Sequence, residues 1–331
     1  MEYSDIRCLV VGTGSIGKRH IFNLLQAGVQ TAIFSTGHTK ARFQDPRVVL
    51  YTDDWQEALS FAPHLAIVAN PTALHVSTIE KLIDQDVYIF VEKPLSNHIE
   101  DFNRLLANRP DAKKKIIVGY NFRFHAAIQF LKQTIAGNII GKISYIKCQV
   151  GQYLPDWHPG EDYREGYVAR AELGGGVVRT LSHEIDYVDY LIGQPIREIS
   201  CMTSNISDLE IDVEDTANVL IRYEKSIAEI HMDMVRRIPV RELVVYGDNG
   251  YLKWNDMKNT IHIQTAEGEK VIWESARNER NMSFVQELKA LLNSVQHKKI
   301  DDRFGDPVKT MEVISRCLTS AHQKNVISWK R

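Results

Sequence analysis

The feature that most restricts the fold of this chain is a glycine-rich turn between an apolar run and a helical pattern. The turn reads Gly12-Thr13-Gly14-Ser15-Ile16-Gly17, after the strand-like Ile6–Val11 and before the helix-like Lys18–Ala27. In this setting the first glycine permits a tight turn, the second lets backbone approach a pyrophosphate, and the third allows close helix–strand packing. The N–H groups of the helix start attract phosphates. The order of strand, turn and helix therefore predicts a dinucleotide-binding Rossmann domain.

The first 120 residues repeat this rhythm of strand and helix. Short runs rich in Val and Ile suit parallel strands that are covered on both faces. The expected strands are Ile6–Val11, Thr31–Phe34, Val48–Leu50, Leu65–Ala69, Tyr88–Val91 and Ile116–Val118. Capping-box spacing predicts helix starts at Asp53, with Gln56, and at Asn97, with Glu100. We predict a doubly wound parallel sheet, because parallel neighbours need crossover connections.

A different rhythm begins near residue 140, where strand patterns with polar alternation follow one another. They are Ile143–Val150, Ile196–Ser204, Thr216–Tyr223, Ser226–Met234, Glu242–Tyr246, Tyr251–Trp254, Thr260–Gln264 and Val271–Trp273. Helical patterns cover Ser182–Leu191, Phe284–Val295 and Val308–His322. The expected fold class is α/β, with a Rossmann domain over residues 1–122. An α/β domain over residues 123–331 would hold substrate on an open, mostly antiparallel sheet.

Composition excludes several classes of function. With 40 basic and 42 acidic residues the formal charge is −2, so no net basic field favours nucleic acid or anionic lipid. No apolar stretch is long enough for a membrane span, and the charged Met1–Asp5 start does not resemble a signal peptide. Cys8, Cys148, Cys201 and Cys317 are far apart and lack metal-ligand spacing. We expect a cytoplasmic protein with reduced cysteines and no metal site.

The end of the second strand bears on the choice of cofactor. NAD-specific sites usually place an acid there to bind the ribose hydroxyls. This chain has Ser35 and Thr36 instead, with no carboxylate before Asp45, and Lys40 and Arg42 follow. Hydroxyls with nearby cations suit a 2′-phosphate, so the pattern favours NADP over NAD. The alternative is that both basic residues are solvated and that Ser35 caps a turn.

Two further segments end buried strands at the edge where ligands bind in open α/β sheets. One is Asn70-Pro71-Thr72, with His75 one turn into the next helix, and the other is Glu92-Lys93-Pro94. Glu92 can pair with the Lys93 ammonium, and a lysine beside a substrate hydroxyl can exchange the proton that accompanies hydride transfer. These residues are candidates for cofactor contact, and Lys93 is a candidate for catalysis. The alternative is a surface lysine at a strand end.

A second motif, Gly174-Gly175-Gly176 followed by His183-x-x-Asp186, joins a flexible turn to a helix. Residues three apart share one helix face. His183 could act as acid or base there, with Asp186 or a backbone group setting its tautomer. The alternative is a histidine that packs in a domain interface.

The motifs Gly12-x-Gly14-x-x-Gly17-x-x-His20, Glu92-Lys93-Pro94 and Gly174-Gly175-Gly176…His183-x-x-Asp186 together resemble the glucose-fructose oxidoreductase, inositol dehydrogenase and rhizopine-catabolism (Gfo/Idh/MocA) family. The resemblance covers nearly the whole chain. It implies tightly held NAD(H) or NADP(H), sugar-type substrates, and dimers or tetramers formed through the second domain's sheet. It also implies that Lys93 is the catalytic or hydroxyl-orienting lysine and that the Lys93–Pro94 bond is cis.

The chain departs from the family's inositol-type members at one position. Those members show an aspartate four residues before the histidine, whereas this chain has Arg179. An arginine fork binds carboxylate or phosphate in bidentate fashion. We therefore hypothesise an anionic sugar substrate, such as a nucleotide sugar, a sugar phosphate or a sugar acid.

Residues 151–164 form an aromatic and polar segment of the kind that binds sugars. With residues 119–124 and 180–183, this segment resembles a branch of the family from surface-polysaccharide and nonulosonic-acid pathways. Further substrate-contact candidates are Asn121, Arg123, Trp157, His158, Tyr163, Arg164 and Asp186.

The sequence leaves three functions open. The first is an NAD(P)-dependent dehydrogenase or reductase that acts on the CH–OH group of an anionic sugar, with Lys93 and His183 handling the proton. The second is the same enzyme acting on a neutral inositol or free sugar. The third is a non-catalytic regulator that binds a dinucleotide, against which the presence of two proton carriers argues.

Overall fold

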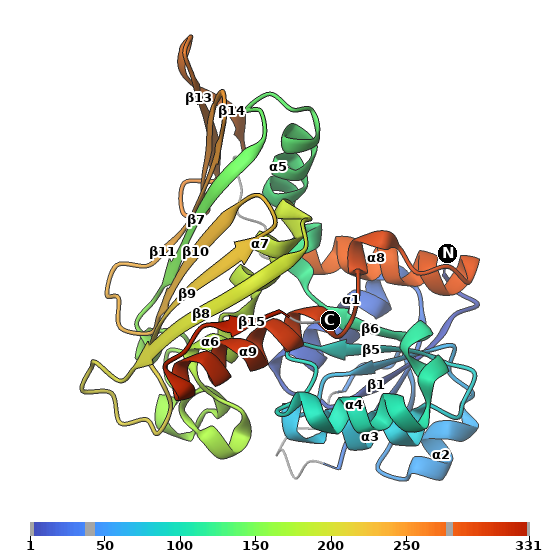
Figure 1. The fold of residues 1–331 in the computed structure, drawn as a ribbon. Helices are drawn as coiled ribbons and strands as arrows, with labels where there is room; N and C mark the ends of the chain where they lie inside the picture. Colours follow the sequence, from blue (N-terminus) through green and yellow to red (C-terminus); the bar gives the residue numbers. More distant parts are fainter. Residues whose placement is uncertain (1–2, 37–43, 276–280, 330–331) are drawn as a thin grey trace. The chain divides into compact units, whose positions relative to one another are not determined.

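The computed structural model describes residues 3–36, 44–275 and 281–329, and the chain divides into two compact units (Figure 1). Unit 1 comprises Met1–Asn121 and Asn281–Met311, and unit 2 comprises Phe122–Arg280 and Glu312–Arg331. The expected C-terminal domain, 123–331, therefore needs a correction, because residues 281–311 return to the first unit. The reason is the apolar face of α8 (Met282–His297), whose buried leucines and valine pack on the Rossmann side, with α1 among its neighbours.

Unit 1 is built on the predicted parallel sheet, in the order β3-β2-β1-β4-β5-β6. Its strands are β1 (Arg7–Val11), β2 (Gln30–Phe34), β3 (Val48–Thr52), β4 (Leu65–Val68), β5 (Tyr88–Glu92) and β6 (Ile116–Gly119). Its helices include α1 (Ser15–Ala27), α2 (Trp55–Ser60), α3 (His75–Leu82) and α4 (Ile99–Asn108). Figure 1 shows α1 and α8 on one face of the sheet and α3 and α4 on the other. The strand order reverses between β1 and β4, and ligands bind at the carboxyl ends of strands beside such a switch.

The helix starts in unit 1 differ from the capping-box predictions. Asp54, not Asp53, is the N-cap of α2, and its side chain accepts a 2.7 Å hydrogen bond from the backbone N–H of Gln56. The N-cap of α4 is His98 rather than Asn97, and no side chain caps this helix. Spacing alone placed both starts one residue early, because Asp53 and Asp54 are equally good caps in sequence.

Unit 2 contains a nine-stranded sheet in the order β14-β13-β12-β11-β7-β10-β9-β8-β15. Its strands are β7 (Ile143–Gly151), β8 (Ile196–Ser204), β9 (Thr216–Tyr223), β10 (Ile227–Asp233), β11 (Val240–Gly247), β12 (Gly250–Asn255), β13 (Thr260–Thr265), β14 (Gly268–Glu274) and β15 (Ile327–Ser328). All eight predicted strands are present, and β15 is an addition at one edge. The sheet is mostly antiparallel, as predicted, with β7 and β10 paired in parallel.

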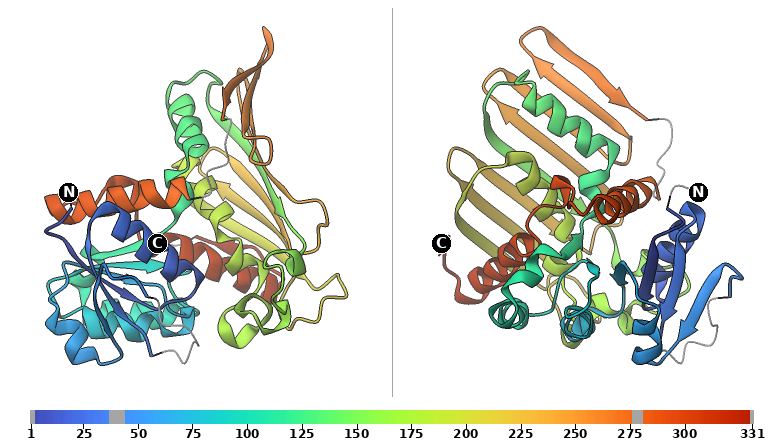
Figure 2. Two further views of the ribbon diagram at one scale, coloured as in Figure 1. Left: turned by 180° about the vertical axis from the view of Figure 1, so that it is seen from behind. Right: turned by 90° about the vertical axis from the view of Figure 1, so that its right-hand side faces the viewer.

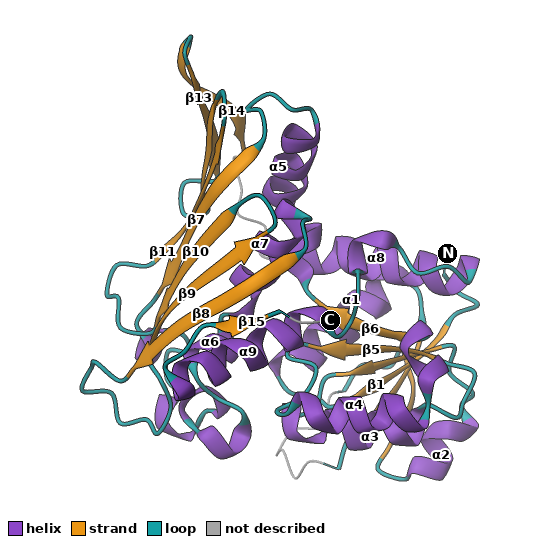
Figure 3. Ribbon diagram, viewed as in Figure 1, coloured by secondary structure: helices purple, strands orange, loops and turns teal. Residues whose placement is uncertain are grey.

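One face of this sheet is covered by helices (Figures 2 and 3). Helix α7 (Ser182–Ile192) packs on β7 and β10, and α5 (Ala126–Ala136), which the sequence analysis missed, packs against α7. The remaining α-helices are α6 (Val177–Thr180) and α9 (Lys309–Gln323). Strand β9 alternates buried and exposed side chains, as expected for a half-covered sheet. None of the helices in the described ranges has the length and apolarity that a membrane crossing needs.

Candidate active site

The glycine turn of unit 1 leaves space where a dinucleotide would lie. Gly12 has φ of +102°, and a Cβ there would lie 2.8 Å from the carbonyl oxygen of Ala69. A Cβ on Gly17 would overlap the carbonyl oxygen of Gly12. Beside Gly14, by contrast, no heavy atom of the described residues lies within 4 Å of a Cβ position. Gly14 also caps α1 without a side chain, so the N–H groups that begin at Ser15 remain available to a phosphate.

The end of β2 supplies hydroxyl groups next to this turn. The Ser35 and Thr13 hydroxyl oxygens are 3.1 Å apart, Ser35 is half-buried, and Thr36 is exposed. Lys40 and Arg42, on which the preference for NADP depended, lie outside the described residues.

The turn after β4 carries a buried polar atom that suits a ligand. The Asn70 Nδ2 donates to Thr78 Oγ1 at 2.9 Å, while Asn70 Oδ1 is buried and has no hydrogen-bond partner among the described residues. Buried polar atoms are nearly always satisfied, so an orphaned acceptor at this edge fits a donor from the cofactor. Pro71 is exposed and Thr72 is half-buried, which leaves both near enough to solvent to meet a ligand.

The ring of His75, a predicted cofactor contact, lies between two backbone carbonyl groups. Its side chain is 1% exposed, and its two ring nitrogens each lie 3.0 Å from a backbone carbonyl, Nδ1 from Pro94 and Nε2 from Asn70. Burial lowers the pKa of the ring, so it is neutral at pH 7. His75 joins two backbone segments rather than presenting a nitrogen to a ligand.

Lys93 is half-buried at the end of β5, and the Lys93–Pro94 peptide bond is cis, as the family resemblance implies. The preceding residue, Glu92, is buried, and its Oε1 lies 2.6 Å from Nε2 of His20 on α1. Glu92 was expected as the partner of Lys93. The structure gives Glu92 a histidine partner from the helix that follows the glycine turn.

In unit 2, His183 lies at the start of α7 and is half-buried. Its ring packs against Phe122, with centroids 5.0 Å apart. The guanidinium carbon of Arg241 lies 4.5 Å from the Phe122 ring centroid, and Arg241 is ion-paired with Glu184 at 2.8 Å. An aromatic ring backed by a fixed cation therefore supports the imidazole.

Arg123 and Asp186 form one buried ion pair in unit 2. Arg123 Nε and Nη2 donate to the two carboxylate oxygens of Asp186 at 2.8 and 2.7 Å. Asp186 is fully buried and Arg123 is 6% exposed. Because the bidentate pair uses both carboxylate oxygens inside the protein, we correct both residues from substrate contacts to a structural pair that anchors α7.

Asn121 also has a structural partner. Its Nδ2 donates to Ser283 Oγ at 2.7 Å within unit 1, and both side chains are buried. This bond joins the segment after β6 to α8, so Asn121 is corrected from a substrate contact to a packing residue.

Arg179 has a half-buried guanidinium group with weak support from the protein. Its Nη1 donates a long 3.4 Å bond to the Gly175 carbonyl, and its Nε is buried without a partner among the described residues. Burial lowers its pKa, opposed by the charge of Glu214. Glu214 accepts from the N–H of Val178, and burial raises its pKa. A cation held this loosely has donors left for a ligand.

The aromatic loop after β7 divides into two parts. Trp157 is half-buried, donates from Nε1 to the Gln152 carbonyl at 3.1 Å, and lines a cavity of about 190 Å³ together with Leu181 and Arg241. His158 is exposed. The Trp157 part therefore retains a hollow that a small molecule can enter.

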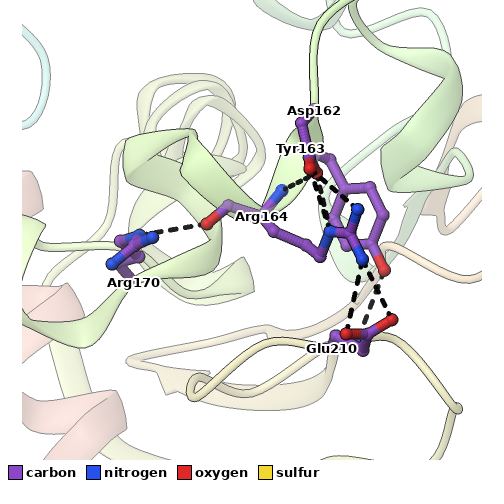
Figure 4. A network of polar contacts seen from close by, with 5 residues as sticks. All are labelled: Asp162, Tyr163, Arg164, Arg170 and Glu210. Atoms are coloured by element: carbon purple, nitrogen blue, oxygen red, sulfur yellow. Dashed lines mark hydrogen bonds and ion pairs between the residues drawn. The ribbon is translucent and has the colours of Figure 1, made fainter.

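The other part of this loop is tied to the protein by its own polar contacts (Figure 4). Arg164 donates to Asp162 at 2.8 Å and to Glu210 at 3.3 Å, and Tyr163 Oη accepts from the backbone N–H of Glu210. Arg164 is exposed and paired. Tyr163 and Arg164, both predicted substrate contacts, therefore hold this part of the loop through contacts within the protein.

Two residues with clear positions were not given roles from the sequence. His20 was noted only as part of a motif, and its spacing after Gly17 was the available signal. Glu214 lies in a loop with no pattern around it, so no local signal in the sequence indicated that its charge acts on Arg179. Among the described residues no three His, Cys, Asp or Glu side chains are grouped as metal ligands.

Comparisons with known proteins agree with this geometry. A model described as the oxidoreductase family with an NAD-binding Rossmann fold matches residues 6–120, and the GFO/IDH/MocA C-terminal domain model matches residues 128–253. A myo-inositol 2-dehydrogenase of Thermotoga maritima is 24% identical over 308 residues, which is 88% of each chain. A 2,7-anhydro-N-acetylneuraminate hydratase of Mediterraneibacter gnavus is 22% identical over 63% of this chain and 56% of that protein.

Two solved structures have the same fold. Levoglucosan dehydrogenase in complex with NADH has a TM-score of 0.86 at 16% identity and covers 98% of this chain and 99% of that one. A myo-inositol dehydrogenase of Corynebacterium glutamicum has a TM-score of 0.80 at 20% identity, with 98% and 99% coverage.

The parallel sheet and the open glycine turn form a Rossmann domain, and the family model that matches it identifies an oxidoreductase with an NAD(P)-binding domain. The two matching models together place the chain in the Gfo/Idh/MocA family.

Proposed function

We propose that this chain is a dehydrogenase or reductase that interconverts a carbinol and a ketone on a sugar or cyclic polyol, with Lys93 and His183 as its proton carriers. A bound nicotinamide supplies or accepts the hydride. The observation that carries the proposal is the Lys93 turn, which follows β5 at the same strand edge as the glycine turn and Asn70.

In this proposal the Lys93 amine holds the reacting hydroxyl and exchanges its proton. An amine at the carboxyl end of a Rossmann strand lies where the nicotinamide half of a dinucleotide is expected. His183 serves as the second acid or base, because its ring is held by Phe122 and is only half-buried. A lone lysine could bind a hydroxyl, but a second titrating group gives the proton a route to solvent.

The choice of substrate is between a neutral and an anionic sugar. The names of myo-inositol and levoglucosan relatives favour a neutral ring. Arg179 and the relative that acts on an N-acetylneuraminate derivative, which is a sugar acid, favour an anionic one. We propose that the carboxylate or phosphate of an anionic sugar pairs with Arg179, whose Nε has no hydrogen-bond partner in the described part of the chain.

We propose NADP as the cofactor, because β2 ends in hydroxyl side chains without a carboxylate. Titration of the purified protein with NADPH and NADH, followed by nicotinamide fluorescence, tests this. Tighter binding of NADH would overturn it.

A substrate screen tests the enzymatic proposal. The protein is incubated with each oxidised cofactor and with matched neutral and anionic sugars, such as glucose and glucuronate or inositol and inositol phosphate. Formation of the reduced nicotinamide is followed by absorbance. Turnover that is lost in Lys93→Met supports the proposal. Tight cofactor binding with no turnover of any sugar, and no oxidation of the reduced cofactor by any keto-sugar, would instead favour a regulator that only binds the dinucleotide.

We also propose a homodimer or homotetramer formed through the open face of the unit 2 sheet. That face exposes Met202, Leu220 and Ile227, which are 73%, 49% and 46% accessible. Light scattering after gel filtration tests this, and a monomer at micromolar concentration would contradict it.

A further inference from the structure

Two buried histidines of unit 1 have no part in the hydride chemistry described above. His20 lies on α1 and is 2% exposed, and His75 lies on α3 and is 1% exposed. Each helix begins just after a turn that was assigned to the cofactor, the glycine turn for α1 and the Asn70 turn for α3. Each histidine therefore lies next to a turn assigned to the cofactor, and its side chain can link that turn to another segment of unit 1.

The second connection of each histidine is to a chain neighbour of Lys93. His20 Nε2 lies 2.6 Å from Oε1 of Glu92, the residue before the lysine. His75 Nδ1 lies 3.0 Å from the carbonyl oxygen of Pro94, the residue after it. The lysine turn is thus held from both sides by imidazole rings.

The contact with Glu92 is directional. The His20 ring meets the Phe90 ring edge-on, with centroids 5.5 Å apart, and meets Phe284 of α8 in the same way at 6.3 Å. With two aromatic neighbours the imidazole has little freedom to rotate. The carboxylate that it holds is itself buried, and burying a carboxylate is costly unless it is paired. Simple packing would be better served by an apolar side chain at position 92.

The contact with Pro94 closes a link to the cofactor edge. His75 Nε2 lies 3.0 Å from the carbonyl oxygen of Asn70, so a single ring bridges the ends of β4 and β5. A neutral imidazole has one N–H, and it can donate to only one of these carbonyls at a time. Its position between them nevertheless sets the separation of the two turns.

We propose that His20 and His75 are positioning residues for Lys93 that act through Glu92 and Pro94, and that they fix the amine relative to the bound dinucleotide. This inference rests on the proposed role of Lys93. A lysine side chain is long and flexible, so the place of its amine depends on the backbone from which it starts. A displacement of about 1 Å at a reacting group costs on the order of 100-fold in rate.

The test compares His20→Leu with His20→Gln, since glutamine keeps an N–H donor for Glu92 and leucine does not. His64→Leu is the matched control, because His64 is half-buried in the same unit at the opposite, amino end of β4 and accepts from the Arg7 N–H at 3.2 Å. We expect His20→Leu to lower kcat about 10- to 100-fold. Cofactor binding by fluorescence should be unchanged, His20→Gln should recover most of the rate, and His64→Leu should turn over normally.

Normal kcat in His20→Leu would overturn the inference, as would an equal loss of cofactor binding and rate in His20→Leu and His64→Leu. If His20→Leu does not fold, Glu92→Gln takes its place under the same criteria. His75→Gln is measured beside His75→Leu in the same way.

A readout independent of turnover separates this inference from the proposed function. The lysines are ¹³C-methylated by reductive methylation, and the Lys93 resonance is assigned by its absence from Lys93→Arg. A shift of the Lys93 resonance in His20→Leu that is restored in His20→Gln supports the positioning role of His20. This holds even if Lys93→Met remains active and the catalytic role of Lys93 fails. An unchanged Lys93 resonance in His20→Leu overturns the positioning role of His20, whatever the kinetics show.

Discussion

The lysine turn of unit 1 and the histidine segment of unit 2 are built in opposite ways. The lysine turn is surrounded by neutral or paired contacts, with an imidazole on the residue before Lys93 and another on the residue after it. The histidine segment contains Arg179, a half-buried cation with a long hydrogen bond to Gly175 and a buried Nε that no described residue partners. The first arrangement suits a group that must be held in one place, and the second suits a cation that binds a ligand, as the proposed function requires. In the proposed function, Lys93 of unit 1 and His183 of unit 2 would carry the proton, and Arg179 of unit 2 would select the substrate.

Removing the Lys93 amine from the lysine turn should have the largest effect. We expect Lys93→Met to lower kcat by about 100- to 10,000-fold, the range for loss of a general acid or base. Cofactor binding should persist, because the glycine turn is untouched. Steady-state kinetics and fluorescence titration measure this, and Lys81→Met, an exposed lysine on α3, is the control. A kcat within a few-fold of wild type would remove Lys93 from the chemistry.

The buried ion pair is the point where the unit 2 segment is rigid. Arg123→Met removes the bidentate partner of the buried Asp186 carboxylate, so we expect a loss of about 3–5 kcal/mol in unfolding free energy. Arg164→Met, which removes an exposed and solvent-screened pair, should change stability far less. Urea denaturation compares the two. Equal effects would show that Asp186 is not held as a buried charge.

The next prediction concerns Arg179, the weakly supported cation of the histidine segment. We expect Arg179→Met to raise KM for a carboxylate or phosphate sugar by about 10-fold or more, as loss of a charge-assisted bidentate bond predicts. The neutral analogue of the same sugar should be affected little. An unchanged KM for the anionic substrate would contradict the proposal and favour a neutral polyol.

The smallest effect concerns pH and the neutral His75. Its pKa in the folded protein is lowered by burial from the ordinary value of 6.5, so the unfolded chain binds a proton more readily than the folded one. Stability is therefore full above about pH 6.5 and declines as pH falls towards the folded pKa. Thermal melts from pH 8 to pH 5 should show less of this decline in His75→Gln than in wild type. An identical pH dependence would mean that His75 does not titrate on unfolding.

Sequence patterns could predict most of the fold, because it depends on local periodicity. The six strands of unit 1 and eight of the nine in unit 2 follow from apolar runs and alternation. The exceptions have physical reasons. Strand β15 has two residues and shows no period, and α8 belongs to unit 1 through contacts that are distant in sequence.

The candidate site was less predictable, because a residue's partner decides its role. Arg123 and Asp186 look like ligand contacts in sequence, yet each satisfies the other. His75 is a candidate for cofactor contact in sequence, yet its ring is buried between two carbonyls. The role of His20 depends on Glu92, which is 72 residues further along the chain. Pairings of this kind have no period or spacing that a sequence pattern can reveal.

The most direct test of the account is a crystal structure of the protein with its dinucleotide and an unreactive sugar analogue. The account predicts that the Lys93 amine and a ring nitrogen of His183 both lie within about 3 Å of the hydroxyl on the carbon that faces the nicotinamide. A structure in which the sugar hydroxyl meets neither group, or meets Lys93 while His183 points to bulk solvent elsewhere, would contradict it.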